Sequence, residues 1–519
     1  MRTFADVLLR AAGQHGDRLA VRCGTADLSF AELVHRCRQV GGLLDALGTG
    51  PGDRVALWSA NSAEYVEIYA GVPAAGRVVV PLNTRWTEHE IADAVVDSGA
   101  SVLLCDRDPG TVAEALGEAG QVVRLDPDDG HAAPPALGYH DLLAAAPAAE
   151  FHAAHEDDLA GLFYTGGTTG RSKGVMLTHR NLLANTAHSQ TTLPLVGPGD
   201  TGSGGAGPDV YLVVAPMFHA AGSNSVLQCI ALGVPQVIVP AFDPAGCLEA
   251  IETQRCTTTL VVPAMLAALL EAHPAAGRDV GSMRLIAHGA SPIAMEVVRR
   301  ASEVFPNAEL VHLYGTTETA PLLSGLRHEE LLTDSDRGKS AGRPVLGVSL
   351  RIEGPDGRPA PAGAAGEVLA SGANVMAGYW NRPDETAAAL VDGWYRTGDI
   401  GLLDDEGYLY IVDRAKDMIV SGGENVYCSE VEEVLFRHPK VLEATVFGVP
   451  HERWGEQVHA VVVARDPSLT EAELVEFCRG SLAGYKLPRS VSFHDGELPK
   501  SGPGKVLKRE LREPYWEGR

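Results

Sequence analysis

A loop rich in glycine and threonine has the composition of an anion-binding site. The stretch TGGTTGRSKG, from Thr165 to Gly174, holds four glycines, three threonines and one lysine. Glycines let backbone N–H groups approach a ligand closely, threonines add hydroxyl donors, and Lys173 adds a positive charge. Because Lys173 is followed by glycine and not by serine or threonine, this is not a Walker-type loop. The composition predicts a phosphate cradle of another design, with an ordinary flexible loop as the alternative.

Four further stretches carry groups suited to parts of a nucleotide or to other anions. LYGTTE (313–318) offers Tyr314 for stacking on a base and Glu318 as an oxygen ligand for Mg²⁺, although a surface turn would look similar. WYRTGD (394–399) ends in Asp399, which can accept hydrogen bonds from ribose hydroxyls. The third stretch, YIVDRAKDMIVSGGENV (410–426), has alternating charges, which a solvated hairpin would also explain. The fourth, LPKSGPGKVLKREL (498–511), is basic, which a solvated tail would also explain.

The elements that must position these motifs alternate between strand and helix. Apolar runs predict strands, and periodic segments between them predict helices, for example over 87–100 and 244–255. The predicted strands are VVVPL, SVLLCD, QVVRL, DLAGLFYT, VYLVVAP, PQVIVP, TTTLVVP and RLIAHG, all between Val78 and Leu313. This alternation indicates parallel sheets covered by helices, which bind ligands beyond the carboxyl ends of their strands.

The C-terminal third has a different pattern. Short strand-like pieces split by turns predict a small β-rich unit from Gly347 to Tyr410. After DRAKD, the pairs Ser429–Glu432 and Thr470–Glu473 predict helix starts with capping boxes, and EATVFGV and HAVVVA predict strands. We therefore expect an N-terminal domain over residues 1–415 and an α+β lid over residues 416–519.

Composition excludes several classes of protein. A formal charge of −25 over 519 residues argues against a nucleic-acid partner, because a phosphate polymer selects basic surfaces. The eight cysteines include no C-x-x-C pair, which favours reduced thiols in the cytoplasm. The N-terminus does not have the pattern of a signal peptide. No run reaches about 18 apolar residues, so we expect no membrane span.

Taken in order, the motifs resemble those of the adenylate-forming (ANL) superfamily of acyl-CoA synthetases, firefly luciferase and peptide-synthetase adenylation domains. The resemblance covers nearly the whole chain and is strongest to the fatty acyl-CoA synthetase branch, through RPDETAAAL, GWYRTGDIG and DRAKDMIVSGGENVY. It implies an α/β fold: a large N-terminal domain of two parallel-rich, helix-covered sheets plus a β-rich subdomain, and a small mobile C-terminal α+β domain. Two departures occur, Gly167 where serine is usual and Ser172 where proline is usual, and the first removes a hydroxyl donor to pyrophosphate.

The resemblance implies a two-step reaction that uses ATP, Mg²⁺ and coenzyme A. A carboxylate attacks the α-phosphate of ATP to give acyl-AMP and pyrophosphate, and a thiol then expels AMP. The implied catalytic residues are Lys505, between the two reacting anions; Glu318, on Mg²⁺; His219, between the phosphate and acyl sites; and Thr165. From the sequence alone, His219 is equally well a hydrogen-bonded core histidine.

The remaining implied site residues bind ATP or CoA. The phosphates of ATP would contact Thr165, Gly166, Gly167, Thr168, Thr169, Gly170 and Lys173. The ribose would contact Asp399 and Arg414. The rest of the nucleotide site would be lined by Gly289, Ala290, Tyr314, Gly315, Thr316 and Thr317. Lys416 would be the pivot of the mobile domain, and Gly422, Gly423 and Trp454 would face the pantetheine arm of CoA.

The acyl pocket is expected to involve FHAAGSNSV (218–226) and VVPAMLAALLEA (261–272). The second segment has no cation from Val261 to Leu270, whereas a dicarboxylate would need a buried positive partner. An amino acid would need an acidic residue where this chain has His219. The sequence therefore favours an apolar monocarboxylic acid: a medium- or long-chain fatty acid first, a bulky aromatic or polycyclic acid second.

Other functions remain open at this level. An acyl-AMP ligase that loads a carrier protein would use the same chemistry, and a luciferase-like oxygenase would share the adenylation step. A regulatory nucleotide-binding module would need an inactive centre, whereas Lys505 and Glu318 are both present. The sequence fixes neither the acid nor the oligomeric state, for which a homodimer is one option.

Replacement of Lys505 should separate the two half-reactions. Because its ammonium would stabilise two approaching anions only in the first step, Lys505→Ala should slow acyl-AMP formation by about 100-fold or more. Thioester formation from supplied acyl-AMP should continue. Pyrophosphate release and thioester synthesis, measured separately, check this, and an equal loss in both would contradict the role.

Overall fold

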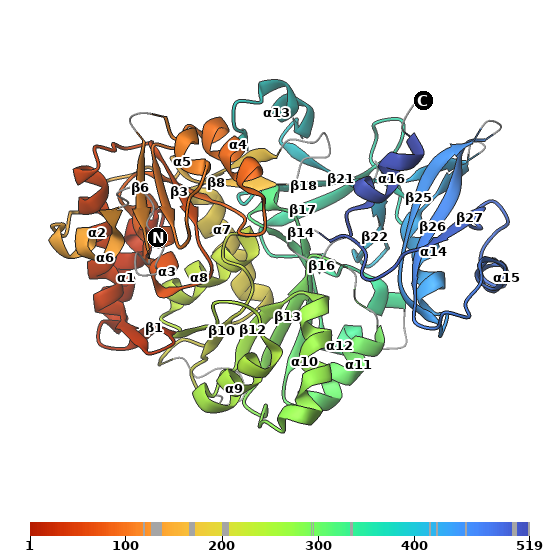
Figure 1. Cartoon of the computed structure of the whole chain (residues 1–519), viewed down its shortest axis with the longest axis horizontal. Helices are drawn as coiled ribbons and strands as arrows, with labels where there is room; N and C mark the ends of the chain where they lie inside the picture. Colours follow the sequence, from red (N-terminus) through yellow and green to blue (C-terminus); the bar gives the residue numbers. More distant parts are fainter. Residues whose placement is uncertain are drawn as a thin grey trace. The chain divides into compact units, whose positions relative to one another are not determined.

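The computed structural model describes residues 1–519 apart from 118–119, 126–136, 166–171, 200–206, 292, 294, 333–335, 415–416, 422–423, 452–453, 501–505 and 517–519. The chain forms two compact units (Figure 1). The larger comprises Met1–Ser349 and Ala370–Tyr395, and the smaller comprises Leu350–Leu369 and Arg396–Arg519. The domain boundary that the sequence analysis places between residues 415 and 416 stays a prediction.

A nine-stranded sheet forms one half of the larger unit, with the order β16-β15-β14-β13-β12-β10-β11-β1-β2. Its strands are β1 (Leu19–Cys23), β2 (Ala26–Ser29), β10 (Tyr211–Val213), β11 (Gln236–Ile238), β12 (Thr258–Val261), β13 (Leu285–Gly289), β14 (Glu309–Gly315), β15 (Leu322–Arg327) and β16 (Arg343–Pro344). The strands from β14 to β1 are all parallel, and antiparallel pairs close both edges.

An eight-stranded sheet, ordered β19-β9-β8-β4-β3-β5-β6-β7, forms the other half. Its strands are β3 (Arg54–Trp58), β4 (Val78–Pro81), β5 (Val102–Cys105), β6 (Gln121–Arg124), β7 (Leu137–Gly138), β8 (Leu159–Thr165), β9 (Lys173–Thr178) and β19 (Gly378–Tyr379). The sequences VVVP and VLLC of β4 and β5 are buried throughout, because a parallel sheet is covered on both faces. The prediction of two parallel-rich sheets is confirmed.

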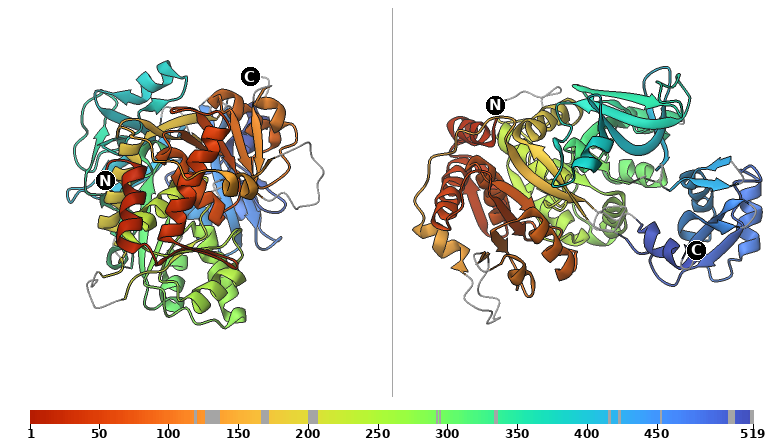
Figure 2. Two further views of the ribbon diagram at one scale, coloured as in Figure 1. Left: turned by 90° about the vertical axis from the view of Figure 1, so that its left-hand side faces the viewer. Right: turned by 90° about the horizontal axis from the view of Figure 1, so that it is seen from above.

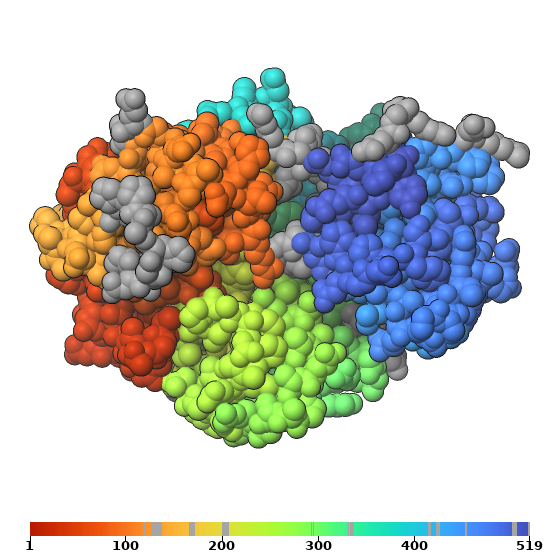
Figure 3. Space-filling model, viewed as in Figure 1, coloured from red at the N-terminus to blue at the C-terminus, as the bar shows by residue number. Residues whose placement is uncertain are grey.

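Helices cover both sheets. They are α1 (Phe4–His15), α2 (Phe30–Ala46), α3 (Ala63–Ala74), α4 (Glu88–Ser98), α5 (Val112–Ala115), α6 (Tyr139–Ala145), α7 (His179–Thr192), α8 (Ala220–Leu232), α9 (Pro244–Gln254), α10 (Pro263–Ala276), α11 (Met295–Val304), α12 (His328–Leu331) and α13 (Pro383–Ala389), with 3₁₀ turns η1 (Thr317–Thr319) and η2 (Asp336–Lys339). Capping boxes at Thr3, Ser29 and Thr87 start α1, α2 and α4. Helices α1 and α2 pack together (Figure 2), and residues of α9 and α10 form part of the outer surface in Figure 3.

A five-stranded sheet follows, composed of β17 (Val348–Glu353), β18 (Gly366–Gly372), β20 (Leu390–Val391), β21 (Trp394–Leu403) and β22 (Leu409–Arg414). These strands confirm the β-rich character predicted for residues 347–410. The prediction of one separate unit is wrong for the middle of this range, because β19 pairs with β9 in the eight-stranded sheet of the larger unit. The turns on either side of β19 suggest a local unit, but its pairing with β9, about 200 residues earlier in the chain, places it in the larger unit.

The C-terminal part of the smaller unit is α+β, as predicted. Its sheet contains β23 (Ile419–Ser421), β24 (Glu424–Val426), β25 (Val441–His451), β26 (Gly455–Ala464) and β27 (Ser490–Phe493), packed with α14 (Cys428–Phe436), α15 (Glu471–Arg479) and α16 (Lys508–Trp516). The Thr470 hydroxyl accepts a hydrogen bond from the Glu473 N–H at 3.2 Å, which confirms the helix start and half of the predicted capping box. The Glu473 carboxylate forms an ion pair with Lys440 at 3.0 Å instead of completing the box. The mobility of this part stays a prediction.

The capping box predicted at Ser429 and Glu432 is wrong. Helix α14 begins at Cys428, and the Ser429 hydroxyl donates to the Val412 carbonyl. Glu432 instead binds across the fold: it accepts from the Val446 N–H at 2.8 Å and forms an ion pair with Lys508 at 2.8 Å. These tertiary contacts offer the carboxylate more partners than the helix terminus does.

In the described ranges, no helix is both long and apolar enough to cross a bilayer. All eight cysteines are unpaired thiols.

Loss of the Lys508 ammonium should destabilise the smaller unit. The side chains of Lys508 and Glu432 are only 18% and 20% exposed. Burial alone would lower the pKa of Lys508, but the charge of Glu432 and of other nearby acidic groups outweighs it and leaves the pKa raised. Lys508→Ala would leave a largely buried carboxylate without its counter-ion, so we expect a loss of about 3 kcal/mol in unfolding free energy. Denaturant unfolding measures it. The control Arg479→Ala removes an exposed pair with Glu476 and should cost less than about 1 kcal/mol; equal losses in both variants would contradict the buried-pair argument.

Candidate active site

Several predicted site segments of the larger unit lie at one edge of the nine-stranded sheet, whereas Thr165 and Lys173 belong to the eight-stranded sheet. Strands β14, β13, β12 and β10 are neighbours and parallel, so the segments after them emerge along the same edge. Beyond β14 comes the turn with Glu318, at the end of β13 lie Gly289 and Ala290, and β12 and β10 lead into α10 and α8. The predicted nucleotide and acyl segments therefore follow one another in the order of the strands.

Glycine is required where the predicted nucleotide turns pack closely. A Cβ atom on Gly289 would lie 2.5 Å from the Leu313 carbonyl oxygen, and one on Gly315 would lie 1.8 Å from the Pro321 carbonyl oxygen. Ala290 adopts a left-handed conformation with φ of 69°. These contacts fix the backbone beside Tyr314, so the turn shapes depend on glycine at 289 and 315.

Two buried histidines lie directly below these turns. His288 and His312 are paired across β13 and β14, and their Nδ1 atoms are 3.4 Å apart. Burial lowers the pKa of His288 to about 3 and that of His312 to about 4, and the neighbouring ring contributes to the shift at His288. Both rings are therefore neutral at pH 7 and place no positive charge below the predicted adenine site.

Glu318 lies on the 3₁₀ turn η1, and one of its oxygens is already held. The Tyr379 hydroxyl donates to Glu318 Oε1 at 2.9 Å, and the Met376 N–H donates to the Glu318 carbonyl at 2.8 Å. Burial and the nearby carboxylate raise the pKa of Tyr379 well above its ordinary value, so its hydroxyl remains a donor. No hydrogen bond from the described residues reaches Glu318 Oε2.

This donor set fits Mg²⁺ bound together with a nucleotide. Mg²⁺ is usually held by one or two carboxylates plus the phosphates of a substrate, not by a protein cage. Within the described ranges no group of three or more His, Cys, Asp or Glu side chains could form such a cage. The single oriented carboxylate of Glu318 is therefore suited to hold Mg²⁺ together with the phosphates of a nucleotide.

Thr165 and Lys173 lie opposite each other at the open end of the β8–β9 pair. The Lys173 ammonium forms an ion pair with Glu385 on α13 and lies 5.1 Å from the centre of the Tyr379 ring. Tyr379 therefore touches both Lys173 and Glu318, two residues that the sequence assigned to the same nucleotide. The predicted loop residues Gly166, Gly167, Thr168, Thr169 and Gly170 lie outside the described residues.

The connection between the two sheets is made by residues 373–380, which the sequence analysis did not identify. Asn374 donates to the carbonyls of Thr319 at 2.7 Å and Leu322 at 2.8 Å, and Trp380 N–H donates to the Gly174 carbonyl at 2.8 Å. Asn181 on α7 donates to the carbonyls of Ala373 and Val375. The sequence offered one indication of this role: Asn374 is a polar residue at the start of the mostly apolar stretch NVMAGYW (374–380).

His219 precedes α8 and is largely buried. Burial lowers its pKa to about 4, with a smaller contribution from the charge of Arg85. No described residue forms a hydrogen bond with its buried Nε2, so the interpretation as a fully bonded core histidine does not hold. Its role between the phosphate and acyl sites stays a prediction.

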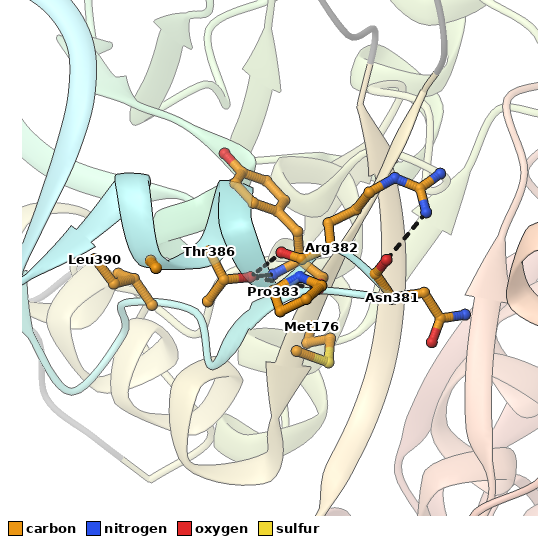
Figure 4. A pocket seen from close by; sticks show the side chains of 8 residues that line it. Met176, Asn381, Arg382, Pro383, Thr386 and Leu390 are labelled. Carbon is orange, nitrogen blue, oxygen red and sulfur yellow. Dashed lines mark hydrogen bonds between the residues drawn. The ribbon is translucent and has the colours of Figure 1, made fainter.

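A pocket of 470 Å³ opens beside Tyr379 (Figure 4). It is lined by Met176, Tyr379, Asn381, Arg382, Pro383, Thr386, Ala387 and Leu390. Thr386 Oγ1 accepts from the Tyr379 N–H at 2.9 Å and fixes the strand against α13. Neither predicted acyl segment lines this pocket, so it is distinct from the predicted acyl site.

In the smaller unit, the two predicted ribose ligands are brought together. Asp399 and Arg414 are directly paired across β21 and β22, and Asp399 is 3% exposed. The Trp454 ring stacks on His451 at 4.3 Å between centroids, and the Arg489 guanidinium lies 5.1 Å from the Trp454 ring. Lys416, Gly422, Gly423 and Lys505 lie outside the described residues, but the flanking Lys500 and Val506 form an antiparallel bridge.

Comparison with known proteins identifies the family. The family model of the AMP-binding enzyme matches residues 8–380, and that of the AMP-binding enzyme C-terminal domain matches residues 430–505. Together they cover both the nucleotide turns and the C-terminal α+β part.

Three relatives span almost the whole chain. A feruloyl-CoA synthase of Amycolatopsis sp is 38% identical, covering 98% of each chain, and the fatty acid–[acyl-carrier-protein] ligase ScoC of Streptomyces coeruleorubidus is 36% identical, covering 96% of this chain and 93% of that protein. The solved structure of o-succinylbenzoate CoA synthetase (MenE) from Bacillus subtilis with its acyl-adenylate intermediate is 31% identical, covers 97% of both chains and has a TM-score of 0.85. The chain therefore belongs to the AMP-binding enzymes of the adenylate-forming superfamily, and it is an AMP-forming acid–thiol ligase.

Proposed function

We propose that this ligase activates an apolar monocarboxylic acid, either a medium- or long-chain fatty acid or a bulky aromatic or polycyclic acid. The observation that carries the proposal is the chemistry of α8 and α10, which follow the neighbouring strands β10 and β12. Helix α8 has no charged residue, and the only titratable residues of α10 are Glu271 and His273, near its C-terminal end. Neither helix offers a cation to a second carboxylate, which would be costly to bury unpaired.

The polar side chains of α8 are already bonded within the protein. The Ser223 hydroxyl donates to the Met217 carbonyl, Asn224 donates to Ser189 at 3.2 Å, and Ser225 accepts from the Tyr211 hydroxyl at 2.9 Å. A polar substrate would have to replace these bonds. An apolar chain or ring can bind without breaking these hydrogen bonds, which further favours an apolar substrate.

The other residues supply binding and charge stabilisation for adenylation. Glu318 would hold Mg²⁺, whose charge offsets the triphosphate when it is bound. Lys173 and Thr165 would contact the phosphates, and Asp399 and Arg414 would hold the ribose. Lys505 would bridge the acid carboxylate and the α-phosphate, where two anions meet and electrostatic stabilisation matters most.

Arg85 supports a second candidate substrate class. This exposed residue lies in the segment after β4, and its charge contributes to the lowered pKa of His219. A cation near the predicted acyl site could pair with a second anionic group, and o-succinylbenzoate CoA synthetase is among the similar structures. An acid with an apolar body and a distal carboxylate is therefore the alternative substrate.

The acceptor has an alternative as well. ScoC carries the name of a ligase that transfers fatty acids to an acyl-carrier protein, and its identity to this chain is close to that of the CoA-dependent relative. Thioester formation with CoA in the absence of any carrier protein distinguishes the two acceptors.

A panel of carboxylic acids tests the substrate proposal. Because the α8 and α10 faces lack cations, decanoate or a ferulate-like acid should exceed malonate and amino acids in kcat/KM by about 10-fold or more. Pyrophosphate release gives the ratio for each acid. A preference for a dicarboxylate that disappears in Arg85→Gln would establish the alternative class, whereas a preference for malonate that Arg85→Gln leaves intact would contradict both.

The ion pair between Lys173 and Glu385 predicts a competition with ATP. If Lys173 binds phosphate, it must leave Glu385; their side chains are 22% and 40% exposed, so the pair contributes up to about 1 kcal/mol. Glu385→Gln should therefore strengthen ATP binding by up to about five-fold. Calorimetric titration with a non-hydrolysable ATP analogue measures this. The exposed neighbour Asp384, changed to asparagine, is the matched control; an equal gain there would mean that only long-range charge matters.

A further inference from the structure

Tyr379 connects the two charged groups that the proposed function places around the triphosphate. Its hydroxyl donates to Glu318 Oε1 at 2.9 Å, and the Lys173 ammonium lies 5.1 Å from its ring centre. Glu318 belongs to the turn after the nine-stranded sheet, whereas Lys173 begins β9 of the eight-stranded sheet. One side chain therefore touches a predicted metal ligand and a predicted phosphate ligand from different sheets.

The backbone of Tyr379 is held independently of its hydroxyl. Its N–H donates to Thr386 Oγ1 at 2.9 Å, and strand β19 pairs with β9 at Val175. The adjacent Trp380 donates from its N–H to the Gly174 carbonyl at 2.8 Å and from its indole Nε1 to the Asp97 carbonyl at 3.0 Å. Removal of the hydroxyl alone should leave the ring in place beneath Lys173.

The hydrogen bond restricts what the Glu318 carboxylate can do. A carboxylate at the end of a side chain can rotate, but a donor fixed on Oε1 sets the plane of the group and the direction of Oε2. Residues that bond to a metal ligand in this way orient it, and their loss typically weakens metal binding by about 10–100-fold.

We propose that Tyr379 is a positioning residue that orients Glu318 toward the metal ion bound with ATP, and that its ring gives Lys173 an aromatic face beside the same phosphates. The proposal rests on the function proposed above, because it takes Glu318 as the metal ligand. It assigns the hydroxyl to the metal and the ring to the lysine, so the two contributions can be separated.

Tyr379→Phe tests the hydroxyl. Mn²⁺ replaces Mg²⁺ as a paramagnetic probe, and its binding is followed by electron paramagnetic resonance in the presence of α,β-methylene-ATP. We expect the dissociation constant of Mn²⁺ to rise by about 10-fold. The affinity for the analogue without divalent metal should be unchanged, because the ring remains under Lys173. The Mg²⁺ concentration that gives half-maximal pyrophosphate release should rise in parallel.

Tyr139→Phe is the matched control. Tyr139 also donates to a carboxylate, Glu67 Oε2, at 2.9 Å, but it lies in the core near α2 and α3. This variant should lose thermal stability while its metal dependence stays at the wild-type value. Unchanged Mn²⁺ binding in Tyr379→Phe, or an equal loss with and without metal, would overturn the positioning role alone. A wild-type enzyme that binds no Mn²⁺ with the analogue and releases no pyrophosphate with any acid would overturn the proposed function together with it.

Discussion

The site depends on the hydrogen bonds that residues 373–380 make to both sheets of the larger unit. The Asn374 amide bonds to the carbonyls of Thr319 and Leu322, and the backbone of Trp380 bonds to Gly174. Asn374 is completely buried, so these bonds form in a medium where an unmade one is costly. Because the turn with Glu318 and the strand with Lys173 are fixed to the same short segment, the two sheets hold in place the two residues that are proposed to bind the metal ion and the phosphates.

Burial also decides which groups near the nucleotide turns carry charge. His219, His288 and His312 all have pKa values lowered to about 4 or below by desolvation, so none is a cation at pH 7. The cations predicted to meet the phosphates are Lys173 and Lys505, and Lys173 is partly exposed. The described part of the site thus keeps its three histidines neutral and leaves positive charge to lysines such as Lys173 and to the metal ion proposed at Glu318.

Much of the larger unit could be predicted from local sequence. Apolar runs such as VVVP predict buried parallel strands, and the glycines at 289 and 315 mark turns where no side chain fits. Tyr379 could not be predicted, because its partners become its neighbours only when β19 pairs with β9. The error at Ser429 has the same origin: Glu432 bonds to Lys508 and Val446, which lie far from it along the chain. Local patterns therefore determined the elements, whereas long-range pairing determined which polar groups meet.

The acidic character of the protein explains why local compensation matters at this site. The chain carries a formal charge of −25, and as an AMP-forming acid–thiol ligase it acts on ATP and a carboxylate, both of which are anions. At physiological ionic strength, charges farther than about 8 Å are largely screened, so distant acidic residues repel these substrates only weakly. Within that distance, Glu385 and Glu318 are the acidic groups in contact with Lys173 and Tyr379. In the proposed function a metal ion would neutralise Glu318, whereas Glu385 would lose Lys173 and keep only its longer contact with Arg382, at 3.9 Å. If Lys173 and Glu318 have the roles proposed above, Glu385 on α13 sets how tightly Lys173 is held before the phosphates bind, and Glu318 on η1 sets the position of the metal ion.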